Sequence, residues 1–145
     1  MRVYLLHHAH AVGPEVDPQR PLSSRGLVQA DWLAAEAGAR GVAPTAIWHS
    51  GKLRARQTAE AILRRVPFAE FRMVRGLRPE DPPGWMRDEL AAEDRDVLVA
   101  GHMPNLAAIA HLLLPGLSEF PLHSLIGLER QKDGGWRLLW TLTPP

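Results

Sequence analysis

Apolar and polar positions along the chain form patterns that predict alternating strands and helices. Val3–Leu6 and Asp96–Ala100 are short, almost continuously apolar runs, which are typical of strands buried on both faces. Two further strands are predicted over Thr45–His49 and Phe68–Val74. Helical spacing of apolar residues predicts four helices: from Ser23 or Ser24 to about Arg40, Leu53–Val66, Gly84 to about Ala92, and Pro104–Leu114.

The C-terminal segment has a different pattern. Leu125–Glu129 and Trp136–Thr141 are predicted to form a hairpin across the turn at Asp133–Gly135. Strands that alternate with helices before it indicate an α/β layer fold with a mostly parallel sheet. The 145 residues are enough for one hydrophobic core and few for two, so we expect a single domain over residues 1–145.

Composition narrows the class of protein. The formal net charge of +1 argues against a surface that coats a polyanion, so no nucleic-acid partner is expected. The absence of cysteine excludes disulfides, thiolate metal sites and a cysteine nucleophile. The first residues carry too short an apolar run for a signal peptide, and no segment is long and apolar enough to cross a bilayer. We therefore expect a cytoplasmic protein without a membrane partner.

Chemically active residues follow three of the predicted strands. His7 and His8 end the first strand, His49 and Ser50 end the second, and His102 follows Gly101 after the strand Asp96–Ala100. Open parallel sheets bind ligands beyond the carboxyl ends of their strands. Imidazoles, an arginine fork and helix N-terminal amides at one such edge would suit a phosphoryl group.

Four ordered motifs resemble the histidine phosphatase superfamily, the phosphoglycerate mutase-like proteins. They are His8 at the strand end and the segments Arg20–Gly26, Ser50–Thr58 and Val99–Pro104. The short chain, without a large helical insertion, is similar to the SixA-type phosphohistidine phosphatases. The resemblance implies a three-layer α/β/α fold, with helices on both faces of the central sheet.

The resemblance also implies roles for particular residues. His8 would be the nucleophile that forms a phosphohistidine intermediate, which water then hydrolyses. Arg54 would hold phosphoryl oxygens, His102 would stabilise the transition state, and Arg20 would lie at the pocket edge. Neither a metal nor an organic cofactor is implied. The expected partner is a phosphorylated small molecule or a phosphohistidine protein, and the oligomeric state is left open.

The first motif departs from the family pattern Arg-His-Gly. This chain has His7, His8 and Ala9, and SixA-type relatives tend to carry Asp where it has His10. His7, if protonated, could substitute in part for the arginine as a phosphate-binding group, which would give a slower phosphatase with a narrower pH range. Ala9 would add a methyl group near the ligand. The alternative is a phosphate- or phosphoprotein-binding protein with little turnover, and we favour retained activity.

Other residues have both structural and functional interpretations. Glu80 and Asp81 could act as a general acid, which a phosphomonoesterase or mutase-like enzyme would need, but solvated loop carboxylates are the simpler interpretation. A metal site at His7, His8, His10 and His102 ranks last, because no carboxylate accompanies them. His10 is expected in solvent, and the remaining histidines are expected to be structural or exposed: His49, His111 and His123.

Overall fold

The computed structural model describes all residues, 1–145, and contains all ten elements that the sequence predicts. The strands are β1 (Arg2–His7), β2 (Ala46–His49), β3 (Glu70–Met73), β4 (Val97–Gly101), β5 (Leu125–Arg130) and β6 (Trp136–Leu142). The helices are α1 (Ser24–Ala39), α2 (Leu53–Leu63), α3 (Pro83–Ala92) and α4 (Asn105–Leu113). None of these helices is long and apolar enough to span a membrane.

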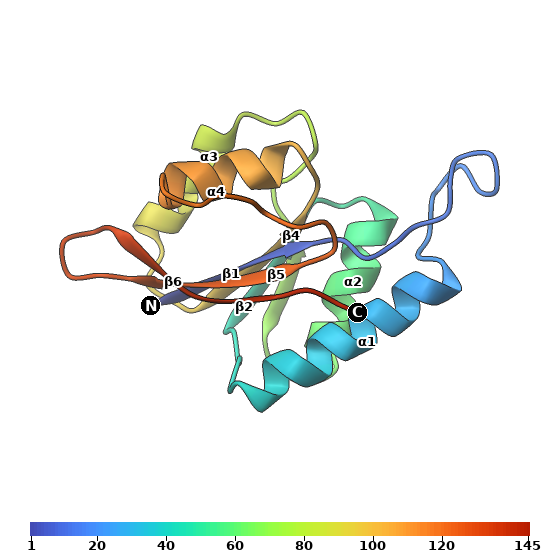
Figure 1. The fold of residues 1–145 in the computed structure, drawn as a ribbon, viewed down its shortest axis with the longest axis horizontal. Coiled ribbons are helices and arrows are strands. Elements are labelled where there is room, and N and C mark those ends of the chain that lie inside the picture. The colour runs from blue at the N-terminus through green and yellow to red at the C-terminus, as the bar shows by residue number, and fades with distance from the viewer.

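The six strands form one sheet in the order β3-β2-β4-β1-β5-β6. The three pairings among β3, β2, β4 and β1 are parallel, whereas β5 runs antiparallel to β1 and forms the hairpin with β6. Helices α3 and α4 cover one face of the sheet, and α1 and α2 cover the other (Figure 1). The expected three-layer α/β/α architecture with a mostly parallel sheet is therefore confirmed.

Alternation along the central strands divides the core into two layers. In β1, Tyr4 and Leu6 pack toward α1 and α2, whereas Val3 and Leu5 pack toward α3 and α4. Strand β4 divides in the same way, and both strands are buried on both faces. These strands are therefore held rigidly, and their carboxyl ends are fixed relative to each other.

Helix α1 begins where the sequence predicts, and its start is held close to the loop after β1. The Ser23 side chain accepts a hydrogen bond from the Gly26 N–H (3.0 Å), as expected of an N-cap. A Cβ at Gly26 would lie 1.9 Å from the His10 carbonyl oxygen. The glycine therefore permits the helix to approach the segment that follows the candidate nucleophile.

Candidate active site

The three polar clusters that follow β1, β2 and β4 lie at one edge of the sheet. These strands are adjacent in the order β2-β4-β1, so their carboxyl ends are neighbours. His7 is in register with Gly101, and His49 is in register with Ala100. The parallel topology therefore brings together residues that lie far apart in the sequence, as expected.

The His8 ring has one nitrogen engaged and the other free. Its Nδ1 lies 2.7 Å from the Ala9 carbonyl oxygen, so Nδ1 carries the hydrogen and donates it. The lone pair is then on Nε2. Burial lowers the pKa of His8 to about 4, although the bond to Ala9 opposes the shift, and the positive charge of Arg54 lowers it further. His8 is therefore a neutral imidazole near pH 7, which is the form that can attack phosphorus.

Arg54 and His102 present polar atoms that have no partner in the protein. The His102 ring centroid lies 5.1 Å from that of His8, and its Nε2 lies 2.7 Å from the Ser50 hydroxyl oxygen. Nδ1 of His102 and Nε of Arg54 are both buried without a hydrogen bond. Unpaired buried polar atoms are costly, and an anion seated between these groups would satisfy them.

The protonation of His102 depends on its contact with Ser50. When the Ser50 hydroxyl donates to Nε2, the ring hydrogen lies on Nδ1 and can be donated to an anion. The same hydroxyl oxygen accepts the Lys52 backbone N–H at 3.2 Å, which leaves its single hydrogen available for His102. Burial, followed by the proximity of His8, lowers the pKa of His102 to about 2, so this ring is also neutral.

Arg20 lies near the same edge, with a left-handed backbone (φ 50°). Its Nε donates to the Val12 carbonyl at 3.0 Å, which anchors the side chain across the loop between β1 and α1. The charge of Arg20 contributes to the lowered pKa values of His8 and Arg54, so its guanidinium is close to both. The structure thus places Arg20 at the periphery of the cluster.

The structure corrects the expectation that His7 could supply a positive charge. Its side chain is 4% exposed, and its Nδ1 accepts the backbone N–H of His123 at 2.7 Å. Burial, with a smaller contribution from His8, lowers the pKa of His7 to about 3. In the free protein His7 is therefore neutral, and its only remaining donor is Nε2–H.

Ala9 does not crowd the site in the way the sequence suggested. It is fully buried and belongs to the hydrophobic core cluster on the α1 and α2 side of the sheet. Its N–H donates to the Thr58 hydroxyl at 3.0 Å, and that hydroxyl donates to the Arg54 carbonyl at 2.7 Å. The alanine is thus accommodated by the core, and its amide connects the strand end to the helix that carries Arg54.

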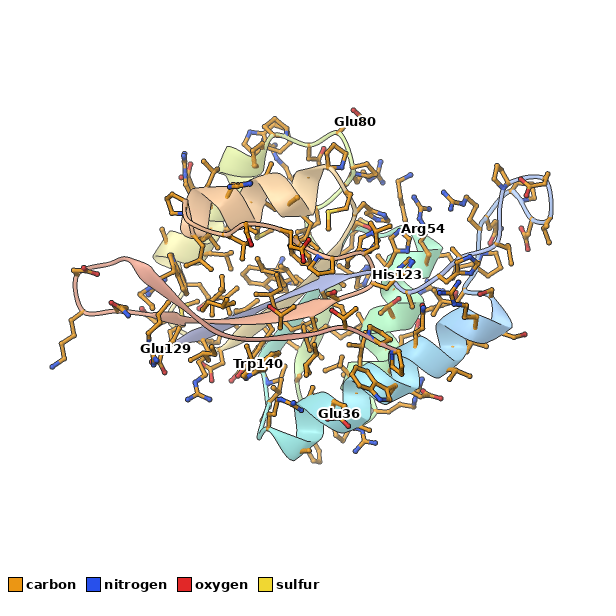
Figure 2. All side chains as sticks on the ribbon, in the orientation of Figure 1. Glu36, Arg54, Glu80, His123, Glu129 and Trp140 are labelled. Atoms are coloured by element: carbon orange, nitrogen blue, oxygen red, sulfur yellow. The ribbon has the colours of Figure 1, made fainter.

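The two candidate general acids are placed differently. Oδ2 of Asp81 accepts the backbone N–H groups of Gly76 and Arg78 at 3.0 and 3.1 Å, so this carboxylate stabilises its own loop. Glu80 is exposed, and its carboxylate points away from the region of Arg54 and His123 (Figure 2). Neither carboxylate makes a hydrogen bond to the histidine cluster.

His10 and His123 have contacts that the sequence did not predict. His10 was expected in solvent, but it is half-buried, with its Nδ1 2.7 Å from the Ser23 hydroxyl. The His123 ring lies 5.1 Å from that of His7, and its Nδ1 lies 2.7 Å from the His8 carbonyl oxygen. No local motif marks His123. The available signal was topological, since β5 runs antiparallel beside β1 and therefore begins where β1 ends.

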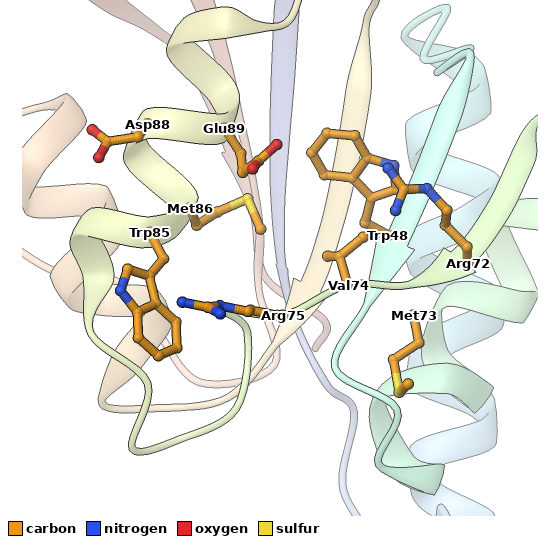
Figure 3. Close-up of a pocket in the computed structure, with 9 residues that line it drawn as sticks. All are labelled: Trp48, Arg72, Met73, Val74, Arg75, Trp85, Met86, Asp88 and Glu89. Atoms are coloured by element: carbon orange, nitrogen blue, oxygen red, sulfur yellow. The ribbon is translucent and has the colours of Figure 1, made fainter.

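A groove lies beside the cluster, between the β2–β3 edge of the sheet and α3 (Figure 3). Its larger hollow, about 540 Å³, is lined by Trp48, Arg75 and Trp85 among others. A second hollow of about 270 Å³ shares Arg75 and Trp85 and also includes Ser50. The groove thus extends to the residue that holds His102, and the Arg75 guanidinium lies 3.9 Å from the Trp85 ring centroid.

Metal binding was the lowest-ranked alternative from the sequence. Within residues 1–145, no group of three or more histidine or carboxylate side chains is arranged to hold a metal ion.

The sequence model of the histidine phosphatase superfamily (branch 1) matches residues 7–96, more than half of the chain. This protein belongs to the histidine phosphatase superfamily. The match includes the segments that carry His8 and Arg54. No curated protein matches the chain in sequence.

Solved structures of other proteins share the fold over almost the whole chain. The protein histidine phosphatase SixA in complex with tungstate has a TM-score of 0.88 at 23% identity, covering 99% of this chain and 97% of that one. A SixA-type protein from Agrobacterium tumefaciens has a TM-score of 0.82 at 28% identity, with the same coverage. A mycobacterial glucosyl-3-phosphoglycerate phosphatase has a TM-score of 0.71 at 19% identity, covering 94% of this chain and 96% of that one. Proteins named for different phosphatase activities therefore share this one fold.

Proposed function

We propose that this protein is a phosphatase that hydrolyses phosphohistidine through a phosphohistidine intermediate on His8. The observation that carries the proposal is the state of three side chains at the sheet edge. His8 is neutral with a free Nε2, and the partnerless Nε of Arg54 and Nδ1 of His102 lie in the same cluster. A nucleophile beside unpaired donors is the arrangement that phosphoryl transfer needs.

The reaction proceeds in two steps. The Nε2 lone pair of His8 attacks phosphorus, an N–P bond forms, and the bond from phosphorus to the leaving nitrogen breaks with its electron pair on that nitrogen. Arg54 and His102 stabilise the charge on the transferring oxygens. Water then attacks phosphorus, the bond from phosphorus to Nε2 of His8 breaks with its electron pair on that nitrogen, and the water protons leave with inorganic phosphate, which restores the neutral imidazole.

The substrate class follows from what the cluster lacks. A protonated phosphoimidazole leaves without further protonation, whereas an alkoxide leaving group needs a general acid. Glu80 points into solvent and Asp81 is occupied by loop amides, so neither is poised for that task. These placements favour a phosphohistidine over a phosphomonoester. The adjoining groove offers room for residues that flank a phosphohistidine in a protein.

Turnover of a phosphohistidine peptide and of a chromogenic phosphomonoester tests the proposal. We expect hydrolysis of the peptide, its loss in His8→Ala, and wild-type turnover in His111→Ala, which alters an exposed histidine on α4. His7→Arg is expected to raise turnover because two charged donors for phosphate outweigh the loss of the acceptor for the His123 N–H. Undiminished hydrolysis by His8→Ala would disprove the assignment. Faster hydrolysis of the ester than of the peptide would favour a small phosphomonoesterase instead.

One observation favours a second candidate function, a phosphate- or phosphoprotein-binding protein with little turnover. The neutral His7 stands where the family pattern has a permanently charged arginine. Purified protein that binds inorganic phosphate, but hydrolyses neither substrate, would support this candidate and exclude the first.

A further inference from the structure

We propose that His123, in its protonated form, is a second cationic contact for the phosphoryl group beside Arg54. The proposal deepens the proposed function, because it concerns the same site. It assigns to a residue from the C-terminal hairpin the positive charge that the strand-end motif lacks.

The position of His123 is fixed by two contacts with the strand-end motif. Its backbone N–H donates to Nδ1 of His7, and its ring Nδ1 lies 2.7 Å from the His8 carbonyl oxygen. The ring centroid lies 5.1 Å from that of His7, 6.0 Å from that of His8 and 6.2 Å from that of His10. The imidazole is therefore packed among the histidines that surround the nucleophile.

The hydrogen-bonding capacity of the His123 ring leaves one nitrogen unused. Because a carbonyl oxygen only accepts, Nδ1 must donate to the His8 carbonyl. Nε2 makes no hydrogen bond within the protein, and the side chain is only partly buried. In the imidazolium form Nε2 would present an N⁺–H donor, while the Nδ1 contact keeps the ring in place.

The charges around His123 make this role specific. Its neighbours His7 and His8 have pKa values lowered to about 3 and 4, so both are neutral over the range where imidazoles ordinarily titrate. Arg54 lies near both of these rings, Arg20 also lies near His8, and His10 from the following loop faces His123 edge-on. Nε2 of His8 is also free but is the attacking atom, so the free Nε2 of His123 is the nitrogen that the C-terminal hairpin can direct at a bound dianion.

Replacement of His123 by asparagine separates charge from structure. The Asn side-chain amide occupies the place of Nδ1–H and can still donate to the His8 carbonyl. Asparagine also tolerates the left-handed backbone at this position (φ 62°) better than most residues. His123→Asn therefore removes the ionisable Nε2 and the ring contacts, while it keeps the hydrogen bond to the His8 carbonyl. His111→Asn is the matched control, since it removes an exposed histidine from α4.

The experiment is calorimetric titration of the purified full chain with sulfate, a tetrahedral phosphate analogue that remains a dianion over about pH 5 to 8, the range in which imidazoles titrate. Wild type and His111→Asn are expected to bind about ten- to a hundredfold more tightly at the acidic end, as a charge-assisted hydrogen bond requires. His123→Asn is expected to lose this dependence and to bind with the alkaline-end affinity throughout.

Two results would overturn the proposal. Sulfate affinity that does not depend on pH in the wild type, or a dependence that persists in His123→Asn, would exclude a cationic role for His123. Because the readout is anion binding, it holds even if the chain turns over no substrate. Absence of phosphatase activity with an intact pH effect would refute the proposed function and leave this inference standing.

Discussion

Mild acid is expected to destabilise this protein through its buried histidines. Histidine has a pKa of about 6.5 in an unfolded chain, whereas in the folded protein the pKa values of His7, His8 and His102 are about 3, 4 and 2. Between these values the unfolded chain binds protons that the folded protein does not. The free energy of unfolding therefore falls as pH decreases below 6.5, and it levels off only below the folded-state pKa values.

The size of the effect follows from the pKa difference. From pH 6.5 to pH 5 is 1.5 units, and each unit corresponds to about 1.36 kcal/mol, so each fully buried histidine contributes about 2 kcal/mol. His8 is part-exposed, which makes the sum for the three about 4 to 6 kcal/mol. This is a large part of the roughly 5 to 15 kcal/mol that stabilises a typical domain. Carboxylates paired with arginine, such as Glu70, titrate in the unfolded chain only near 4.5, below this window.

Urea denaturation followed by the fluorescence of the five tryptophans measures this loss at pH 7 and pH 5. His8→Asn, which keeps a donor for the Ala9 carbonyl but cannot be protonated, is expected to reduce the loss by up to about 2 kcal/mol. His111→Asn, on the exposed face of α4, is expected to leave it unchanged. An unfolding free energy that is equal at the two pH values, or higher at pH 5, would refute the reasoning.

Three further outcomes are expected. Ser50→Ala leaves Nε2 of His102 buried without a partner, so unfolding by urea should show a loss of about 1–3 kcal/mol and peptide turnover should fall. Gly26→Ala brings a methyl group against the His10 carbonyl and should cost about 1–3 kcal/mol in the same assay, whereas Gly116→Ala, where a Cβ meets nothing, should be tolerated. Arg75→Ala should raise KM for a phosphohistidine peptide with acidic flanking residues about two- to fivefold without changing kcat. Phosphoramidate has no flanking residues, so an equal rise in its KM would show that the effect does not arise in the groove.

The fold was predictable because each of its elements carries its own local signal. Strands β1 and β4 are buried on both faces and therefore read as continuous apolar runs. Element ends were less predictable: the expected helix Leu53–Val66 ends at Leu63, and the chain continues to Val66 in turns, in which the Arg65 and Val66 N–H groups donate to the Ile62 and Leu63 carbonyls. The position of the hairpin beside β1 could not be read from the sequence, because strand pairing is set by packing between distant segments.

The candidate site likewise combines residues that local motifs mark with residues placed by packing between distant segments. His8, Arg54 and His102 each stand in a motif at the end of a strand, and the parallel order of the strands brings them together. The protonation of His7 was not accessible in this way, since it depends on burial and on an amide 116 residues away. His123 was missed for the same reason, because its neighbours are supplied by the pairing of β5 with β1.

The histidine that replaces the family's arginine at position 7 is physically coupled to His123. Nδ1 of His7 is the acceptor for the His123 N–H, and a guanidinium has no acceptor atom. An arginine at position 7 would therefore gain two donors for phosphate but leave that amide without its partner, at a cost of about 1–3 kcal/mol if the amide stays buried. The loop before β5 would have to turn its backbone to avoid that cost, which would also displace the His123 ring from the His8 carbonyl. The histidine at position 7 is thus part of a three-residue arrangement, and the anion-binding capacity of the site cannot be judged from position 7 alone.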